Sequence, residues 1–208
     1  MPSVVSAKKT KLAAQQVSQE RAGPFTGAVS WSQLKSMGAS YVIVGHSETR
    51  VVSNETDDHI QKKVRMLLEH RMIPVLCVGE SRQEEDGPSS DLGERAGRML
   101  KNLQKEALGR LVIAYEPVWA ISTTLGSRPN TPEKTFQAMV YLRRIVTELY
   151  GRKNADKTRI IYGGSVTSSN IASFLCEGKI EGVLVGQASL KKDEFLKIVR
   201  QASRAKRI

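Results

Sequence analysis

The sequence predicts an α/β fold in which a mostly parallel sheet is wrapped by helices. Six short apolar runs recur along the 208 residues, and segments with helical spacing lie between them. The runs are continuously apolar rather than alternating, which is typical of strands buried on both faces of a parallel sheet. Strands that alternate with helices in this way indicate βαβ units.

The six predicted strands are rich in β-branched residues and span 11–17, 41–45, 73–79, 111–116, 159–163 and 182–186. Three of the intervening segments carry apolar residues on one helical face. These faces comprise Ile60, Val64, Leu67 and Leu68; then Leu92, Ala96, Met99, Leu100 and Leu103; and then Phe136, Met139, Val140 and Leu149. Pro132 fits the first turn of the third helix, with Thr131 as its cap.

Composition excludes several classes of protein. Hydrophobic residues make up 40% of the chain, which argues against disorder, and no apolar run reaches the length of a membrane span. The N-terminus lacks the apolar stretch of a secretory signal. Cys77 and Cys176 lie far apart in apolar surroundings, which favours buried, reduced thiols in a reducing compartment. The histidines and cysteines have no metal-ligand spacing.

The net charge of +11 favours a solvated basic surface over nucleic-acid binding. The basic residues are spread along the chain, and aromatic residues, which would stack on bases, are only 5%. A nucleic-acid partner and a membrane partner are therefore not expected.

Chemically useful residues follow four of the predicted strands. His46, Glu116, Ser165 and Gln187 each stand where a strand gives way to a turn. Taken singly, each has an ordinary structural explanation, such as a hydrogen-bonding histidine or a tight turn. Together they supply a base, an electrophile and backbone amides that bind phosphate. This combination predicts proton abstraction next to the carbonyl of a phosphate ester.

The motifs AYEPVWAI, VGHSE, CVGE, YGGSV and VGQASL, in this chain order, closely resemble the triosephosphate isomerase family. AAQQVS, GPFTGAVS and NETDDHIQKKV extend the resemblance over nearly the whole chain from Lys11. The resemblance implies a (β/α)8 barrel, here one domain over residues 1–208. It also implies interconversion of dihydroxyacetone phosphate and glyceraldehyde 3-phosphate, in glycolysis and gluconeogenesis. The resemblance implies neither a metal nor an organic cofactor. It implies a homodimer located in the cytoplasm.

The resemblance also assigns roles to individual residues. Glu116 would be the base that moves a proton between adjacent carbons, and His46 a neutral imidazole that hydrogen-bonds the developing enediolate oxygen, held neutral by a helix N-terminus. Glu48 would help to order the site, and Thr26 would mark the loop that inserts into a second subunit. The phosphate would rest on four residues: Ser122, Ser165, Gly186 and Gln187.

The sequence departs from the family pattern in its lid, which reads AISTTLGSRPNTP instead of AIGTGKTATP, and in Thr49, which replaces an arginine. A second glycine of the phosphate motif is replaced by Gln187. A backbone N–H survives each replacement of a glycine, so phosphate binding remains possible.

The largest departure is at the N-terminus, where the family's Asn-x-Lys strand has no counterpart. A barrel of this type has about 250 residues, so roughly 40 are missing, equivalent to the first strand, first helix and second strand. We expect about six βα units and an unclosed sheet. Two explanations compete: a true start upstream of Met1, or a fragment that has lost catalysis. The sequence is therefore compatible with two functions: a triose-phosphate isomerase, or a non-catalytic barrel that binds phosphorylated ligands or polyanions.

Overall fold

The computed structural model describes residues 10–21, 23–82, 84, 87–121 and 126–205. Five parallel strands form one sheet in sequence order. The strands are β1 (Leu12–Ala14), β2 (Ala39–Val44), β3 (Ile73–Val78), β4 (Val112–Tyr115) and β5 (Arg159–Tyr162). The predicted parallel α/β architecture is therefore confirmed.

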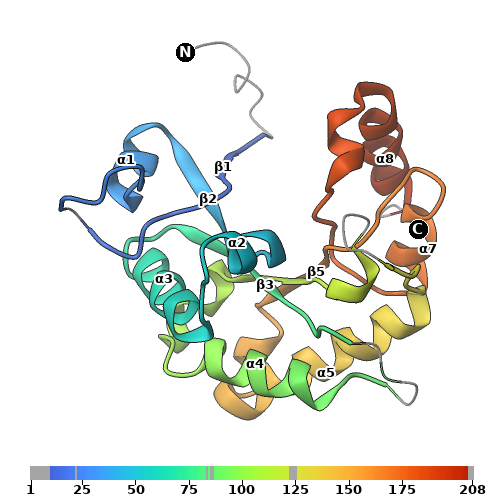
Figure 1. Ribbon diagram of the computed structural model, residues 1–208. Helices are drawn as coiled ribbons and strands as arrows, with labels where there is room; N and C mark the ends of the chain where they lie inside the picture. The colour runs from blue at the N-terminus through green and yellow to red at the C-terminus, as the bar shows by residue number, and fades with distance from the viewer. Residues whose placement is uncertain (1–9, 22, 83, 85–86, 122–125, 206–208) are drawn as a thin grey trace.

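Helices connect the strands and cover one face of the sheet. The α-helices are α1 (Trp31–Ser36), α2 (Ser47–Val52), α3 (Asp57–Glu69), α4 (Ser90–Leu100), α5 (Pro132–Tyr150), α6 (Arg152–Ala155), α7 (Ile171–Cys176) and α8 (Lys192–Ala205). Short 3₁₀ helices are η2 (Lys105–Arg110), η3 (Val118–Ala120) and η4 (Gln187–Leu190). Figure 1 shows α3, α4 and α5 running beneath the sheet, with α1 at one end and α7 and α8 at the other.

The two end strands are shorter than predicted. The run 11–17 is paired only over Leu12–Ala14, and 182–186 contributes a single parallel bridge, between Val183 and Tyr162. Within the described residues, β1 and the Val183 segment do not pair with each other, so the sheet is open, as expected. Each end segment has a strand neighbour on one side only, which explains why little of either run is held in a ladder.

The main hydrophobic core lies between the sheet and its covering helices. Alternate strand residues such as Leu76 and Ile113 pack there against Leu67, Leu92 and Leu142. The opposite, inner face of the sheet has a smaller cluster of Val75, Cys77, Val112 and Ala114, bordered by half-buried Tyr41, Ile43, Ile161 and Leu184. The border residues stay half-buried because the sheet does not close around them.

Two of the three predicted helix faces are confirmed. The apolar residues predicted for these two faces are buried and lie on α3 and α4, except that Leu103, although buried, lies beyond the end of α4. On α5 the prediction is wrong: Phe136, Val140 and Leu149 are exposed, and of that set only Met139 is buried. The residues that α5 does bury are Thr135, Ala138, Met139, Leu142, Ile145 and Val146. Its N-terminus is as predicted, with Thr131 as the cap and Pro132 in the first turn.

Candidate active site

The residues predicted from the strand ends lie at the end of the sheet where the C-termini of the strands meet. Because all strands are parallel, their C-terminal ends meet at this end. His46 follows β2, Glu116 follows β4, and Ser165 follows β5. Gly163 joins these segments: a Cβ at this glycine would lie 3.7 Å from the Glu116 Cβ and 3.8 Å from the Leu184 Cβ. The base and the strand that leads to Gly186 therefore approach one another around the turn after β5.

Glu116 and His46 are in direct contact. The Nε2 atom of His46 lies 2.8 Å from Oε1 of Glu116, and the backbone N–H of Ser47 donates to Oε2 over 3.0 Å. Glu116 is buried, with 3% of its surface exposed. Both oxygens of this carboxylate thus have partners at the start of α2, so the buried charge is satisfied without an ion pair to any Lys or Arg that the structure describes.

His46 is held by the first turn of α2, of which it is the N-cap. Its Nδ1 accepts a hydrogen bond of 3.3 Å from the N–H of Glu48, and its carbonyl accepts from the hydroxyl of Thr49. With Nδ1 acting as acceptor, a neutral ring carries its proton on Nε2, the atom that faces Glu116. The Glu48 side chain itself is exposed, and its Oε2 lies 4.0 Å from Nδ1. Glu48 therefore orders the histidine through its backbone.

Two opposing influences set the charge of His46. The hydrogen bond to Glu116 raises the pKa of His46 above its ordinary value, burial lowers it, and the charges of Glu116 and Glu48 raise it further, so the net direction is upward. The N–H that points at Nδ1 works the other way, because a second proton on the ring would face a donor. In this resting arrangement the contact with Glu116 and the N–H at the start of α2 therefore act in opposite directions on the charge of the His46 ring.

A second buried carboxylate, Glu80, lies behind the site. Its Oε1 accepts hydrogen bonds from the hydroxyl of Tyr115 at 2.7 Å and from the indole N–H of Trp119 at 2.9 Å. Burial and the neighbouring Glu80 raise the pKa of Tyr115, which keeps the phenol protonated. The role of Glu80 was not predicted from the sequence, although it stands two residues after β3, where a polar residue near a strand end is a usable signal.

The segment that follows β4 is tied down at both ends. The hydroxyl of Ser165 donates to the carbonyl of Ala120 over 2.9 Å, and the N–H of Arg128 donates to the carbonyl of Trp119 over 2.9 Å. Ser122, predicted to contact phosphate, lies outside the described residues. Ser165 therefore faces the base of this segment in the present arrangement.

Gly186 and Gln187 are exposed at the start of η4, after the Val183 bridge. The carbonyl of Gly186 accepts from both the N–H and the hydroxyl of Ser189, at 2.9 and 2.7 Å. The first N–H groups of such a turn have no carbonyl within the turn to bond, so those of Gly186 and Gln187 can bind an anion.

Cys77 borders the site from the inner face of β3. Burial raises the pKa of the Cys77 thiol, and the charge of Glu116 and a hydrogen bond to it raise it further, so this thiol stays protonated. Cys176 is also free but exposed, which corrects the expectation that both cysteines are buried.

Thr26, predicted at a dimer contact, lies in an exposed turn of the loop between β1 and α1. A hydrogen bond from the N–H of Ser18 to the carbonyl of Val29 closes this loop at its base. Phe25 and Val29 are 48% and 42% exposed. The loop is therefore closed by a backbone hydrogen bond and exposes apolar side chains to solvent.

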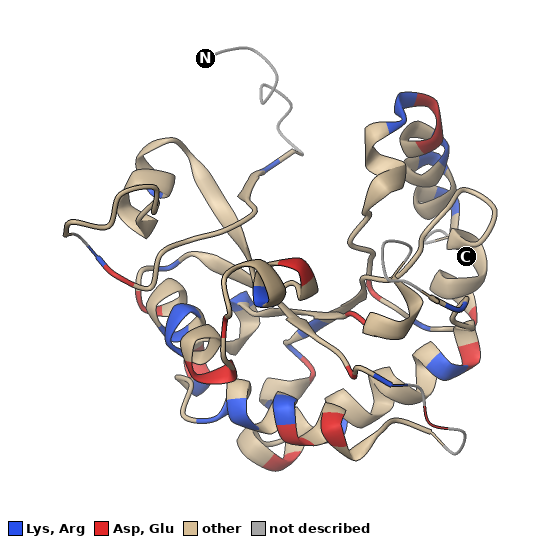
Figure 2. Cartoon of the chain, in the orientation of Figure 1, with Lys and Arg blue, Asp and Glu red and all other residues tan. Residues whose placement is uncertain are grey.

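Three further features of the described residues concern nucleic-acid, membrane and metal sites. Figure 2 shows Lys and Arg on several helices, interspersed with Asp and Glu. None of the helices in the described ranges is long and apolar enough to cross a bilayer. In the same ranges, no group of three or more His, Cys, Asp and Glu side chains is placed to hold a metal ion.

Comparisons with known proteins identify a single family. The family model described as triosephosphate isomerase matches residues 1–202. A triosephosphate isomerase of Clostridium botulinum (strain Langeland) is 41% identical over 197 residues, which cover 94% of this chain and 78% of the relative. The corresponding protein of Dictyoglomus turgidum is 43% identical over 192 residues, covering 91% and 76%. That of Saccharopolyspora erythraea is 42% identical over 195 residues, covering 93% and 74%.

Proposed function

Because the chain belongs to the triosephosphate isomerase family, we propose that Glu116 and His46 interconvert dihydroxyacetone phosphate and glyceraldehyde 3-phosphate. The observation that carries this proposal is their direct contact, 2.8 Å, at the C-terminal edge of a parallel sheet. A buried carboxylate beside an N–H donor is the pair that proton transfer next to a carbonyl requires.

The reaction needs only one base and one hydrogen-bond donor. Glu116 removes a proton from the carbon that bears the hydroxyl group, and the electron pair left behind forms the carbon–carbon double bond of an enediolate. The former carbonyl oxygen gains negative charge, which the Nε2–H of His46 stabilises. A proton passes from the hydroxyl oxygen to the former carbonyl oxygen, and Glu116 returns its proton to the adjacent carbon, so that the carbon that bore the hydroxyl group becomes the new carbonyl carbon. Protons and electrons balance within the substrate, so no redox partner is needed.

Substrate binding has to separate the resting pair. The substrate carbonyl oxygen and Oε1 of Glu116 compete for the same N–H of His46. Once Glu116 turns to the substrate carbon, the contact that raises the pKa of His46 is lost. The N–H of Glu48 still faces Nδ1. The ring is then held neutral with its proton on Nε2, as expected for the electrophile of this family.

The phosphate group is proposed to rest on the amides of Gly186 and Gln187, with Ser165 and Ser122 as further donors. The exposure of the first two residues and the inward-turned carbonyl of Gly186 support this placement. Ser165 would exchange its bond to Ala120 for one to phosphate. This exchange would couple phosphate binding to the segment that starts at η3, which is the base of the family's lid.

We further propose a homodimer in the cytoplasm, assembled through the loop around Thr26. The exposed Phe25 and Val29 on a tethered loop support this surface. Sedimentation equilibrium of the wild type is expected to show a dimer at micromolar concentration, and Thr26→Asp is expected to weaken it. A wild type that sediments only as monomer would contradict the dimer.

The isomerase proposal is tested by hydrogen exchange between substrate and solvent deuterium. The wild-type chain is expected to incorporate deuterium during turnover. Glu116→Gln is expected to lower the rate on the order of 10³-fold, because the base is lost. Glu148→Gln is the matched control, since this exposed glutamate lies on α5 and, among the described residues, forms its ion pair with Arg144. Equal exchange rates for wild type and Glu116→Gln would refute the assignment.

A further inference from the structure

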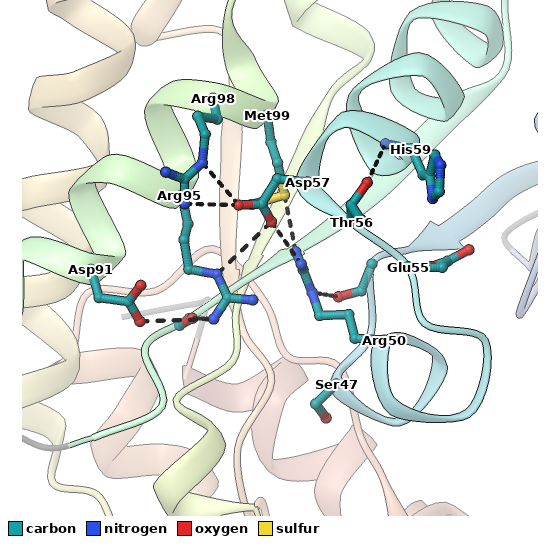
Figure 3. A network of polar contacts seen from close by, with 12 residues as sticks. Ser47, Arg50, Glu55, Thr56, Asp57, His59, Asp91, Arg95, Arg98 and Met99 are labelled. Atoms are coloured by element: carbon teal, nitrogen blue, oxygen red, sulfur yellow. Dashed lines mark hydrogen bonds and ion pairs between the residues drawn. The ribbon is translucent and has the colours of Figure 1, made fainter.

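Asp57, the first residue of α3, holds three arginines from two other helices (Figure 3). Its Oδ1 lies 2.7 Å from Nη1 of Arg50 and 3.9 Å from Nε of Arg95, and its Oδ2 lies 3.0 Å from Nη2 of Arg98. The side chains of Asp57, Arg50 and Arg95 are only 14%, 14% and 17% exposed. This is a partly buried charge network, in which one carboxylate is shared among three cations.

Arg50 connects this network to the turn that presents His46. Its Nε donates a hydrogen bond of 2.8 Å to the carbonyl of Gly45, the residue before His46. Gly45 adopts φ +75°, and a Cβ there would lie 3.0 Å from the side chain of Ile60. The turn therefore needs glycine, both for its left-handed backbone and for its close approach to α3. A planar guanidinium can bond the Gly45 carbonyl and Asp57 at once because its donors diverge in one plane.

Arg95 makes a parallel link to the next strand. Its Nη1 donates to the carbonyl of Gly79 over 3.2 Å. Gly79 precedes Glu80, which binds Trp119 and Tyr115. One carboxylate thus fixes, through two arginines, the C-terminal ends of both β2 and β3.

We propose that Asp57 is a positioning residue for His46, acting through the Arg50 guanidinium and the Gly45 carbonyl. Asp57 contacts neither His46 nor Glu116 directly. With its charge removed, the partly buried Arg50 loses its main counter-ion and the force that aims its Nε at Gly45. The turn after β2 then becomes free to rotate, and the 2.8 Å contact between His46 and Glu116 loosens.

The catalytic arm of this inference rests on the proposed function, so the test includes a readout that does not depend on activity. Nitrogen-15 NMR of His46 reports which ring nitrogen carries the proton. At a pH above the raised pKa of His46, we expect the wild type to show the Nε2–H form of the neutral ring, because Nδ1 accepts from Glu48. In Asp57→Asn we expect a mixture of both neutral forms.

Kinetics provide the second readout. Asp57→Asn is expected to lower kcat by about tenfold to a hundredfold with little change in KM, because a small misplacement of a reacting group affects the transition state more than binding. Arg50→Lys leaves Asp57 intact but cannot bond the Gly45 carbonyl and Asp57 together, so it should reproduce both effects. This second variant keeps the test informative if Asp57→Asn folds poorly, and melting temperatures identify any such loss of folding.

The matched controls are Asp91→Asn and Glu94→Gln. Asp91 lies 3.8 Å from Arg95 and Glu94 lies 3.7 Å from Arg98, so each pairs with an arginine of the network without reaching Arg50. Both controls are expected to keep the wild-type kcat and His46 spectrum. Folded Asp57→Asn and Arg50→Lys proteins with wild-type His46 nitrogen shifts would overturn the proposal. A wild type that does not isomerise triose phosphate would refute the proposed function alone, since the NMR comparison still stands.

Discussion

The indole N–H of Trp119 donates to the buried carboxylate of Glu80 across 2.9 Å, and the same oxygen accepts from Tyr115. Trp119 is the middle residue of η3, which follows Glu116, and Tyr115 is the last residue of β4. Glu80 therefore holds the chain on both sides of Glu116, the proposed base. Its second oxygen, Oε2, is buried and has no hydrogen-bond partner among the described residues, so this carboxylate is only half satisfied.

Replacing Glu80 with Gln should weaken the anchor of Trp119 while leaving the reacting groups in place. An amide oxygen is a poorer acceptor than a carboxylate, and it has to serve two donors. We expect kcat/KM to fall by about tenfold, since a hydrogen bond to a charged group contributes about 1.5–3 kcal/mol. Tyr115→Phe removes one of the two donors and should have a smaller effect. Trp119 fluorescence in a Trp31→Phe background measures the release, and unchanged emission in Glu80→Gln would contradict it.

Protonation of His46 should make the unfolding free energy depend on pH. Because the pKa of His46 is raised in the folded state, its protonated form stabilises the fold relative to the unfolded chain. This contribution is fully present below the ordinary pKa of about 6.5 and is lost as pH rises through the higher folded pKa. The difference in unfolding free energy between wild type and His46→Gln should therefore shrink as pH rises from about 6.5 through the higher folded pKa of His46. Urea titrations across this range measure it, and a difference that grows with pH would show the sign to be wrong.

Substrate capture should depend on salt. The chain carries a net charge of +11, and the proposed substrate is an anionic phosphate ester. A positive field speeds the approach of such a ligand, and added salt screens it. We expect kcat/KM to fall several-fold between 10 and 300 mM NaCl while kcat changes little. A kcat/KM that is independent of salt would mean that the basic residues are too widely spread to steer the ligand.

The sequence predicted the strands and the meeting of Glu116 with His46 for a shared reason. Strands buried on both faces leave a continuous apolar run, and parallel strands bring their ends to one edge. The face of α5 was mispredicted because apolar residues surround this helix, so spacing alone fits both the exposed Phe136 and Val140 and the buried Leu142 and Ile145.

The network around Asp57 could not be predicted from the sequence, for a different reason. Asp57 lies at the start of a helix, where an acidic residue is common, and its arginine partners lie on other helices, where basic residues are common. Neither position therefore indicates a shared network. Only the packing of α3 against α2 and α4 brings them to one point. The same holds for Glu80, whose partners Tyr115 and Trp119 lie more than 30 residues away.

A buried ion pair on α3 offers the sharpest test of the packing itself. Lys63 is 6% exposed and contacts the side chain of Glu55, and its Nζ also donates to Oε1 of Gln16 over 3.0 Å. Lys63→Met removes the cation and leaves the Glu55 carboxylate buried without its counter-charge. Such a change is expected to lower the unfolding free energy by about 3–5 kcal/mol.

The control lies on the same helix. Arg65 pairs with Glu69 at 3.8 Å, and both side chains are about half exposed. Because exposed pairs contribute at most about 1 kcal/mol, Arg65→Met should leave the urea midpoint nearly unchanged. Equal losses for Lys63→Met and Arg65→Met would mean that Lys63 is hydrated in solution and that the link from Gln16, in the segment after β1, to α3 is not formed as described.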